Sequence, residues 1–234
     1  MLSPLVKYEW LELDEVESTQ IIAAQQLLAG SNVGVVFAWD QTKGRGRFDR
    51  TWQSRRGDSL TMSLLFRDYP DPAHPHLFGM ALAIAAAGEL HCQLRWPNDL
   101  CLRKKKLGGI LTEMLPDHTG RRIPVVGIGV NLNQESFPAE LLDHATSLHL
   151  EHASTFHPPA IAHRIIDRIT KLPEPANWSD LADAWSLFDD TPGKNYRLAD
   201  GQTGTAIGIG SDGELLCSVG GESVSVLAAD AIFG

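Results

Sequence analysis

Residues 41–52 of the chain read Gln41-Thr42-Lys43-Gly44-Arg45-Gly46-Arg47-Phe48-Asp49-Arg50-Thr51-Trp52. The stretch carries four fixed positive charges and two glycines in a protein whose formal net charge is -9. Glycine lets backbone N–H groups approach a ligand closely, and an arginine fork matches phosphate or carboxylate oxygens in pairs. The stretch therefore suits an anionic ligand with several oxygens. For an isolated match, a solvated surface loop is the usual explanation, and an arginine-rich contact to nucleic acid is a further alternative.

The composition describes a folded protein with an acidic surface. At 234 residues, 43% of them hydrophobic, the chain is long enough for one sizeable core plus a small appendage. The acidic total argues against general DNA binding, because neutralising phosphates takes a broad basic face rather than one loop. The apolar run 77–87 is too short to cross a bilayer, and residues 1–13 lack the pattern of a secretory signal. We therefore expect a cytoplasmic protein with no membrane association.

Cysteine and histidine spacing predicts no metal held by the protein. Cys92, Cys101 and Cys217 are scattered and cannot all pair, which fits a reducing compartment. The nine histidines form only loose pairs at 74/76 and 149/152. Surface histidines are far more common than an unsupported metal site.

Hydrophobic patterning predicts both strands and helices. β-branched and apolar runs indicate strands at 10–16, 33–39, 59–66, 93–96, 100–103, 107–114 and 125–132. Helical spacing, or apolar residues on nearly every face, indicates helices over 21–29, 77–90, 159–172 and 180–188. The basic stretch follows the strand 33–39 directly, so it lies at a strand end, where sites on open sheets tend to lie.

The C-terminal part has a different pattern. Pro192-Gly193 marks a boundary, and from Asn195 onward short alternating strands are separated by turn signals. These signals are Asp200-Gly201, Asp212-Gly213 and Gly220-Gly221. The pattern predicts a small all-β barrel.

Two polar pairs have both a structural and a functional explanation. Ser18 or Thr19 is a natural N-cap for the helix 21–29, and capping alone explains the pair. Alternatively, one hydroxyl and the free N–H groups of the first turn face a pocket and hold a small polar head group. Asn98-Asp99 follows an extended Trp-Pro, and such a pair is usually a turn.

Lysines join two of the predicted strands. We expect Lys104 and Lys105 to form a solvated hairpin tip, whereas Lys106 is followed at once by Leu107-Gly108-Gly109-Ile110-Leu111, which returns the chain to the interior. Gly108 and Gly109 weaken a strand, so they indicate a close approach by a ligand or another backbone. Asn131 lies in an otherwise apolar strand and needs partners for its amide, which a purine edge would supply.

Five segments, taken together, resemble the motifs of biotin protein ligase. They are Glu17-Ser18-Thr19-Gln20, Gly44-Arg45-Gly46-Arg47 with Trp52, Arg95-Trp96-Pro97-Asn98-Asp99, Lys106-Leu107-Gly108-Gly109-Ile110-Leu111 with Glu113, and Gly127-Ile128-Gly129-Val130-Asn131-Leu132-Asn133. Five motifs in family order over nearly the whole chain make the match highly specific.

The resemblance implies an α+β fold. It consists of a catalytic domain over residues 1–191, with a mixed β-sheet packed with helices like that of class II synthetases, and a small SH3-like β-barrel over 192–234. Ahead of Trp10 there is no room for a helix-turn-helix domain, so the chain resembles the monofunctional form and no specific DNA binding is expected.

The implied activity is a two-step acyl transfer with biotin and ATP as substrates and Mg²⁺ on the phosphates. Biotin and ATP first give biotinyl-5′-AMP and pyrophosphate, and a carrier lysine then attacks the mixed anhydride. The implied partner is the biotin carboxyl carrier protein of acetyl-CoA carboxylase or a related carboxylase. A monomer or a homodimer is expected.

Residue roles follow from the same resemblance. Catalytic roles go to Lys106, Arg47 and Asp99, the last orienting or deprotonating the incoming amine unless it only caps a turn. The residues assigned to biotin are Ser18, Thr19, Gln41, Gly44, Arg45, Gly46, Trp52, Lys106 and Gly109. Those assigned to ATP are Arg45, Arg47, Trp52, Asn98, Lys106 and Asn131.

The chain departs from the family after Gly44-Arg45-Gly46-Arg47. The family commonly continues with a further basic or glycine pair, whereas this chain has Phe48-Asp49. We expect the aspartate to weaken the pull of the arginines or to pair with one of them.

Three alternatives to a biotin ligase stay open. A lipoyl protein ligase shares the fold and the adenylation chemistry, although its loop does not typically read Gly-Arg-Gly-Arg followed by Trp. A nucleic-acid-binding module would explain the arginines but not residues 106–111 or the acidic total. A catalytically inactive scaffold with the same fold predicts no biotin-dependent exchange of pyrophosphate into ATP.

Overall fold

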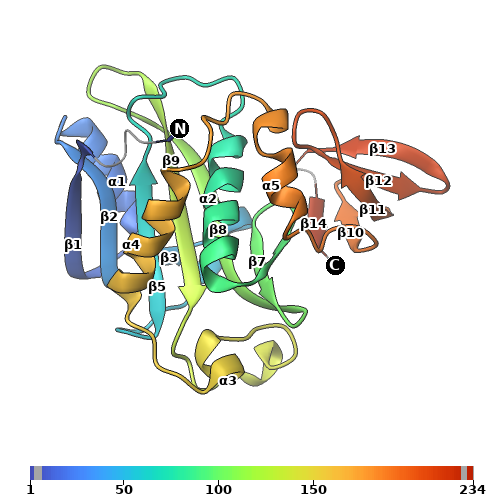
Figure 1. Cartoon of the computed structure of the whole chain (residues 1–234), viewed down its shortest axis with the longest axis horizontal. Coiled ribbons are helices and arrows are strands. Elements are labelled where there is room, and N and C mark those ends of the chain that lie inside the picture. Colours follow the sequence, from blue (N-terminus) through green and yellow to red (C-terminus); the bar gives the residue numbers. More distant parts are fainter. Residues whose placement is uncertain (3–6, 228–230, 234) are drawn as a thin grey trace.

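The computed structural model describes residues 1–2, 7–227 and 231–233, without the side chains of Asp49 and of 231–233. Within this part of the chain, the main sheet has seven strands in the spatial order β1-β2-β5-β9-β8-β7-β6 (Figure 1). In that order their bounds are Glu9–Val16, Val33–Gln41, Ser59–Leu65, Arg122–Asn131, Lys105–Pro116, Asp99–Leu102 and Gln93–Arg95.

Strand directions make the sheet mixed, and the predicted α+β fold is confirmed. β1 and β2 run parallel and are joined by helix α1 (Thr19–Leu28), whereas each other neighbouring pair is antiparallel. All of β5 and most of β2 are buried, as expected of central strands covered on both faces.

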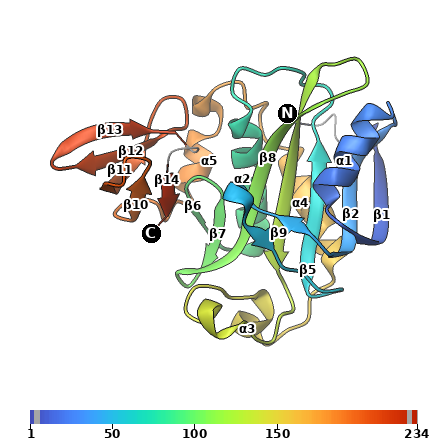
Figure 2. The ribbon, with the colours of Figure 1, turned by 180° about the vertical axis from the view of Figure 1, so that it is seen from behind.

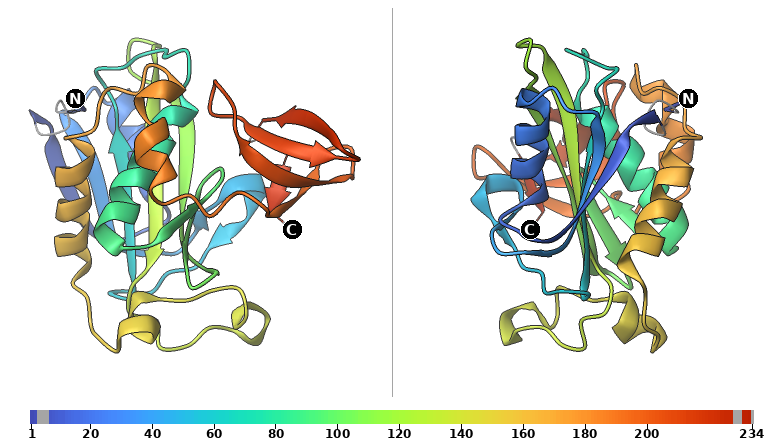
Figure 3. Two further views of the ribbon diagram at one scale, coloured as in Figure 1. Left: turned by 45° about the vertical axis from the view of Figure 1, so that its right-hand side comes forward. Right: turned by 90° about the vertical axis from the view of Figure 1, so that its left-hand side faces the viewer.

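Helices cover the two faces of the sheet unequally. α2 (His76–Leu90) and α4 (Pro158–Ile169) lie side by side on one face, and α1 lies on the other, as the edge-on view in the right-hand panel of Figure 3 shows. α2 is buried over most of its length because α4 and α5 (Ala182–Ser186) pack against it. The predicted helix 180–188 is thus shorter than expected, and a 3₁₀ turn at Trp178–Asp180 precedes it.

The basic stretch forms a small hairpin on the α1 face. β3 (Gly44–Arg45) pairs with β4 (Thr51–Trp52), and a 3₁₀ turn at Arg47–Asp49 joins them (Figure 2). A side chain at Gly44 would collide with the backbone carbonyl of Trp52, so this position needs glycine for packing. Phe48 has a φ of 55° and closes the turn in the left-handed region.

The C-terminal part forms a second, antiparallel sheet in the order β13-β12-β11-β10-β14. The bounds, in chain order from β10 to β14, are Asn195–Leu198, Thr203–Ile209, Leu215–Val219, Glu222–Val226 and Ala231–Phe233. Glycines with positive φ occupy the three predicted turns, at Gly201, Gly213 and Gly220-Gly221.

The second sheet packs against the turn that follows β6. The indole Nε1 of Trp96 donates to the carbonyl of Gly213 at 2.9 Å, and the hydroxyl of Tyr196 donates to the carbonyl of Trp96 at 2.7 Å. Both aromatic side chains are buried in the same apolar cluster as α2 and α4. A domain boundary between residues 191 and 192 stays a prediction.

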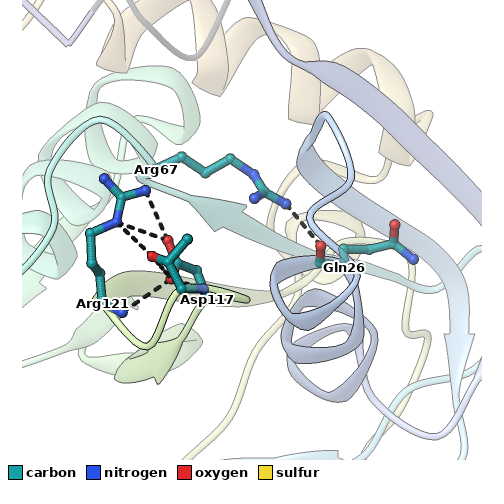
Figure 4. A network of polar contacts seen from close by, with 5 residues as sticks. Gln26, Arg67, Asp117 and Arg121 are labelled. Carbon is teal, nitrogen blue, oxygen red and sulfur yellow. Dashed lines mark hydrogen bonds and ion pairs between the residues drawn. The ribbon is translucent and has the colours of Figure 1, made fainter.

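Polar contacts tie the far end of α1 to the sheet (Figure 4). Arg67 donates from Nε to the carbonyl of Val33 at 2.7 Å and from an NH2 group to the carbonyl of Gln26 at 3.3 Å.

Asp117, in the predicted turn between β8 and β9, accepts from Arg121 through Oδ2 at 2.9 Å. Hydrogen bonds from Thr119 and Arg121 hold the pKa of the Asp117 carboxyl well below its usual range.

The three cysteines are free and buried. Burial raises the pKa of Cys92 to about 12 and that of Cys101 to about 11, so both thiols are protonated at neutral pH. None of the helices in the described ranges is long and apolar enough to span a bilayer.

Candidate active site

A cavity of about 1600 Å³ opens on the face of the main sheet opposite α2. Its wall is built from segments that are distant in sequence: the first turn of α1, the end of β2, the β3–β4 hairpin, the turn 96–98, and parts of β7, β8 and β9. All of the predicted site residues except Gly44 line it. Gly44 lies behind the wall, where it lets the hairpin close.

Glycines leave the floor of the cavity without side chains. A Cβ at Gly129 would lie 2.5 Å from the indole Cε2 of Trp52, and one at Gly127 would lie 3.3 Å from Cδ of Gln20. These distances are too short for a side chain at Gly129 and tight for one at Gly127. Trp52 therefore lies flat on bare backbone, and its buried Nε1 has no hydrogen-bond partner among the described residues.

Gln41, rather than Ser18, caps helix α1 on the cavity side. The Oε1 atom of Gln41 accepts from the backbone N of Thr19 at 2.7 Å and from its hydroxyl at 3.1 Å, and the Thr19 hydroxyl accepts from Ser63 at 2.8 Å. Ser18 occupies the N-cap position with extended backbone, but its side chain makes no capping bond. The predicted N-cap position is thus confirmed at Ser18, but its side chain does not act as the cap, and the residue lines the cavity.

Lys106 and Asp99 form an ion pair in the wall. The Nζ atom of Lys106 lies 2.6 Å from Oδ1 of Asp99, and the lysine stem passes over Gly109, whose Cβ would lie 3.5 Å from the lysine Cε. Asp99 begins β7, and the turn interpretation fits only the residues before it. Gly108 packs against the carbonyl of Gly129, so the predicted close approach is to another backbone at this position.

Arg47 is held beside that pair. Its NH1 donates to Oδ1 of Asn98 at 3.0 Å, and the Asn98 amide donates to the carbonyl of Ile110 at 2.7 Å. Burial lowers the pKa of the Arg47 guanidinium, an effect that the charge of Asp99 opposes. An arginine stays charged despite such a shift, so a partly desolvated cation faces the cavity. Its guanidinium carbon also lies 4.7 Å from the centre of the Phe48 ring.

Arg45 pairs with a carboxylate that sequence reasoning left without a role. Its NH2 lies 3.0 Å from Oε1 of Glu113 and its NH1 lies 3.2 Å from Oε2. Gln20 donates to the same Oε2 at 2.9 Å. The predicted pairing of Asp49 with an arginine falls on a side chain outside the described part of the structure.

Asn131 finds its partners inside the protein. Its Nδ2 donates to the carbonyl of Thr146 at 3.0 Å, and its Oδ1 accepts from Gln134 at 3.2 Å. The expectation that a purine edge must satisfy this amide is therefore wrong, although the residue lines the cavity and a contact to a nucleotide stays a prediction.

The lysine hairpin differs from the expectation at one residue. Arg103 and Lys104 have φ values of 48° and 69° and form the two-residue tip. Lys104 is exposed, as predicted, but Lys105 begins β8 and donates from Nζ to the carbonyl of Leu142 at 2.6 Å. Lys105 thus fixes the segment after β9 against the hairpin instead of being solvated.

Sequence reasoning missed Gln20, Glu113 and the segment 134–145. Gln20 and Glu113 belong to motifs that the sequence analysis had quoted. Glu113 is a polar residue in an otherwise apolar strand, which is the same pattern that drew attention to Asn131. The segment has no periodicity, and only the fold brings it to the cavity: the backbone N of Lys106 donates to the carbonyl of His144 at 2.7 Å.

No group of three or more His, Cys, Asp or Glu side chains within the described ranges could hold a metal ion. The cavity instead brings Arg45, Arg47 and Lys106, together with further cationic side chains such as Arg50, Arg55 and Lys104, into one wall with a polar end formed by Ser18 and the first turn of α1.

Comparisons with known proteins agree with this geometry. The sequence profile of the Biotin/lipoate A/B protein ligase family matches residues 13–133. The chain is 42% identical over 146 residues to the Bifunctional ligase/repressor BirA of Bacillus spizizenii, a match that covers 58% of this chain and 44% of that protein. It is 31% identical to the Biotin--[acetyl-CoA-carboxylase] ligase of Mycobacterium tuberculosis, over 95% of this chain and 89% of that protein.

A solved structure extends the likeness to the whole fold. The biotin protein ligase from Aquifex aeolicus, in complex with biotin and ATP, superposes with a TM-score of 0.78. The superposition covers 97% of this chain and 98% of that one at 26% identity.

Proposed function

The chain belongs to the Biotin/lipoate A/B protein ligase family, and on that premise we propose that it is an ATP-dependent biotin protein ligase. It forms biotinyl-5′-AMP from biotin and ATP and transfers the biotinyl group to a lysine of a biotin carboxyl carrier protein. The observation that carries this proposal is the convergence of Arg45, Arg47 and Lys106 on one cavity beside a polar end formed by Ser18, Thr19 and Gln41. The relatives' names and the biotin–ATP complex of the Aquifex protein support it.

In the first step the biotin carboxylate attacks the α-phosphate of ATP, and pyrophosphate leaves. Negative charge builds up on the phosphate oxygens in that transition state, so fixed cations are the appropriate catalysts. Arg47 suits this role because its guanidinium is partly desolvated and anchored to Asn98. Lys106 suits it because Asp99 fixes the direction of its amine.

The polar end of the cavity would bind the ureido ring of biotin. The hydroxyl of Ser18 is available there because it makes no capping bond, while Thr19 and Gln41 already share a hydrogen bond. Trp52 would contact the ligand with its ring, while its buried indole N–H, which lies against the backbone of Gly129, has no hydrogen-bond partner among the described residues. Gly44 and Gly46 shape the hairpin that carries Arg45.

In the second step the amine of the carrier lysine attacks the carbonyl of the mixed anhydride, and AMP leaves. A base near the incoming amine must accept its proton. Asp99 is the candidate, since its carboxylate lies in the cavity wall next to the cations that hold the adenylate. Because Asp99 also pairs with Lys106, a substitution of either residue would affect the position of the other.

Magnesium would arrive as part of the nucleotide substrate. Mg²⁺ in nucleotide sites keeps several waters and binds phosphates with one or two carboxylates. The described residues offer single cavity carboxylates, such as Asp40 and Asp58, rather than a preformed cluster. This donor set fits an ion that the phosphates carry, and no protein ligand is assigned.

The proposal includes a partner and a location. The biotin carboxyl carrier of acetyl-CoA carboxylase, or of a related carboxylase, is the acceptor, and the enzyme works in the cytoplasm. The lipoyl ligase alternative is less favoured because the named relatives act on biotin. Melting curves with biotin and with lipoate separate the two: biotin alone should raise the melting temperature.

Mass spectrometry of the carrier provides the direct test. A carrier domain incubated with this protein, ATP and biotin should gain the mass of one biotinyl group. A carrier of unchanged mass, together with no biotin-dependent exchange of pyrophosphate into ATP, would refute the proposed activity and favour an inactive scaffold.

A further inference from the structure

A carboxylate on strand β8 holds the cavity arginine nearest the polar end of the site. The Oε2 atom of Glu113 accepts from NH1 of Arg45 at 3.2 Å, and its Oε1 atom lies 3.0 Å from NH2 in the same ion pair. The arginine side chain is 48% exposed and that of Glu113 is 21% exposed. Arg45 lies between Gly44 and Gly46, and Glu113 is the partner that orients its guanidinium.

Gln20 connects this pair to the first turn of α1. Its side chain is only 4% exposed, its Nε2 donates to Oε2 of Glu113 at 2.9 Å, and it lies against the bare backbone of Gly127. The neighbouring residue, Thr19, receives the capping oxygen of Gln41. A continuous polar chain therefore runs from the first turn of α1 through Gln20 and Glu113 to Arg45.

We propose that Glu113 is a positioning residue for adenylation, and that it works by holding Arg45 in the direction of the substrate anions, with Gln20 fixing its carboxylate. This inference rests on the proposed function. A guanidinium has five N–H donors, and the pair with Glu113 engages only those on the side that faces the carboxylate, so other donors stay available for substrate oxygens. A long side chain flanked by two glycines would otherwise lose much rotamer freedom when it binds its ligand.

Stability of the fold is a poor explanation for this arrangement. A half-exposed ion pair contributes little to folding because water and salt screen it. Glu89 provides a comparison inside the same protein, because it accepts from Arg164 and Arg168 between α2 and α4, away from the cavity. Glu89 and Glu113 each bind guanidinium groups, but only Glu113 acts on an arginine that lines the cavity.

The test is a double-mutant cycle on biotin-dependent exchange of pyrophosphate into ATP. Glu113→Gln keeps the size of the side chain, but it removes the charge and turns an amide N–H₂ toward donor groups. We expect kcat/KM for exchange to fall about tenfold, the loss typical of a hydrogen bond to a charged group. In an Arg45→Ala background the same substitution should cause no further loss, because Glu113 would have nothing left to position.

Glu89→Gln is the matched control and should leave exchange kinetics unchanged. If Glu113→Gln exchanges at the wild-type rate, or causes the same loss with and without Arg45, the positioning role is wrong. If Glu113→Gln does not fold, Glu113→Asp keeps the charge but withdraws it by one methylene, and the same cycle decides. An inactive wild type would refute the proposed function itself, whereas an active wild type with unaffected Glu113→Gln refutes only this inference.

Discussion

The Nζ atom of Lys106 lies 2.6 Å from Oδ1 of Asp99, across the β7–β8 hairpin and in the wall of the cavity. The lysine side chain is 41% exposed and the aspartate side chain 19% exposed, so the pair faces the cavity without being sealed from it. A lysine ammonium is a point charge on a flexible stem. The ion pair with Asp99 fixes the position of the Lys106 amine before a substrate binds. The pairing of β7 with β8 therefore sets where this positive charge lies in the cavity.

Lys106→Ala should slow adenylate synthesis strongly while the fold survives. A hydrogen bond to a charged group contributes roughly 1.5 to 3 kcal/mol, so the exchange rate should fall by about one to two orders of magnitude. Pyrophosphate exchange measures the loss, and circular dichroism checks the fold. Lys104→Ala is the comparison, because Lys104 also lines the cavity but is exposed at the hairpin tip, whereas Lys106 is the lysine that pairs with Asp99. Equal rates for the two variants would mean that Lys106 does not bind the phosphates.

Asp99→Asn should separate the two steps of the reaction. The amide can still accept from Lys106, so adenylate synthesis should fall modestly, but it cannot take the proton of the carrier amine. Single-turnover transfer from purified biotinyl-5′-AMP to the carrier should therefore fall further than exchange does. If both rates fall by the same factor, Asp99 only anchors Lys106 and some other group receives the proton.

Ser18→Ala is a cleaner probe of the biotin pocket than a change at Thr19. The Ser18 hydroxyl makes no capping bond, so its removal should shift the melting temperature little and weaken biotin binding. Thr19→Val, by contrast, leaves the buried Ser63 hydroxyl without its acceptor and should cost about 1 to 3 kcal/mol of stability. Calorimetry with biotin measures the affinity. Unchanged affinity in Ser18→Ala would place the ureido ring elsewhere.

How far the sequence predicts this structure depends on the range of the interaction involved. Strands such as 59–66 and the helix 77–90 follow from local patterning, and they agree with β5 and α2 within one or two residues. The cavity residues to which the motifs gave a role were also found, whereas Gln20 and the cavity residues of the segment 134–145 were not. Capping of α1 by Gln41 was not predicted. The capping oxygen lies at the end of β2, which is distant in sequence from the start of α1 and comes close to it only in the folded protein.

Asn131 shows why a correct observation can lead to a wrong ligand. A buried amide must be satisfied, and the apolar pattern of the strand did not indicate which protein groups would satisfy it. The fold supplies the carbonyl of Thr146 and the amide of Gln134 from a segment without periodicity. Glu113 shows the reverse case: its strand was predicted, but only the packing of the hairpin over the sheet brings Arg45 to its carboxylate.

Adjacent arginines provide a test of carrier docking. Arg55 is exposed at the cavity, whereas Arg56 pairs with Asp14 at 2.9 Å and lies near the ring of Trp39. A cation at the mouth of the site attracts an acidic carrier face and repels a basic one. Arg55→Glu should therefore raise KM for the carrier several-fold at low salt without affecting pyrophosphate exchange, which needs no carrier.

Arg56→Glu makes the same charge change outside the cavity and should leave KM for the carrier near its wild-type value. The difference between the two variants should shrink as salt is added, because exposed charges are screened. Equal effects of both substitutions would mean that net charge alone governs carrier binding, and that Arg55 has no local role.

Tyr196 connects the second sheet to the turn that precedes Asn98 and Asp99. Its side chain is fully buried, and its hydroxyl donates at 2.7 Å to the carbonyl of Trp96, two residues before Asn98 and three before Asp99. Tyr196→Phe leaves that buried carbonyl without this donor, a loss of about 1 to 3 kcal/mol. For a chain of this length each kcal/mol lowers the melting temperature by roughly 2–4 °C. Because the same turn positions the partner of Arg47 and the partner of Lys106, pyrophosphate exchange should fall together with stability.

Tyr69→Phe is the matched control: that ring packs on Phe78 at 5.3 Å, and no side-chain hydrogen bond of its hydroxyl is found within the described ranges. The core cluster runs from α2 into the second sheet, so a single melting transition should shift in Tyr196→Phe and stay in place in Tyr69→Phe. A second, lower transition confined to the Tyr196 variant, with exchange at the wild-type rate, would show instead that the small sheet unfolds by itself and does not support the turn.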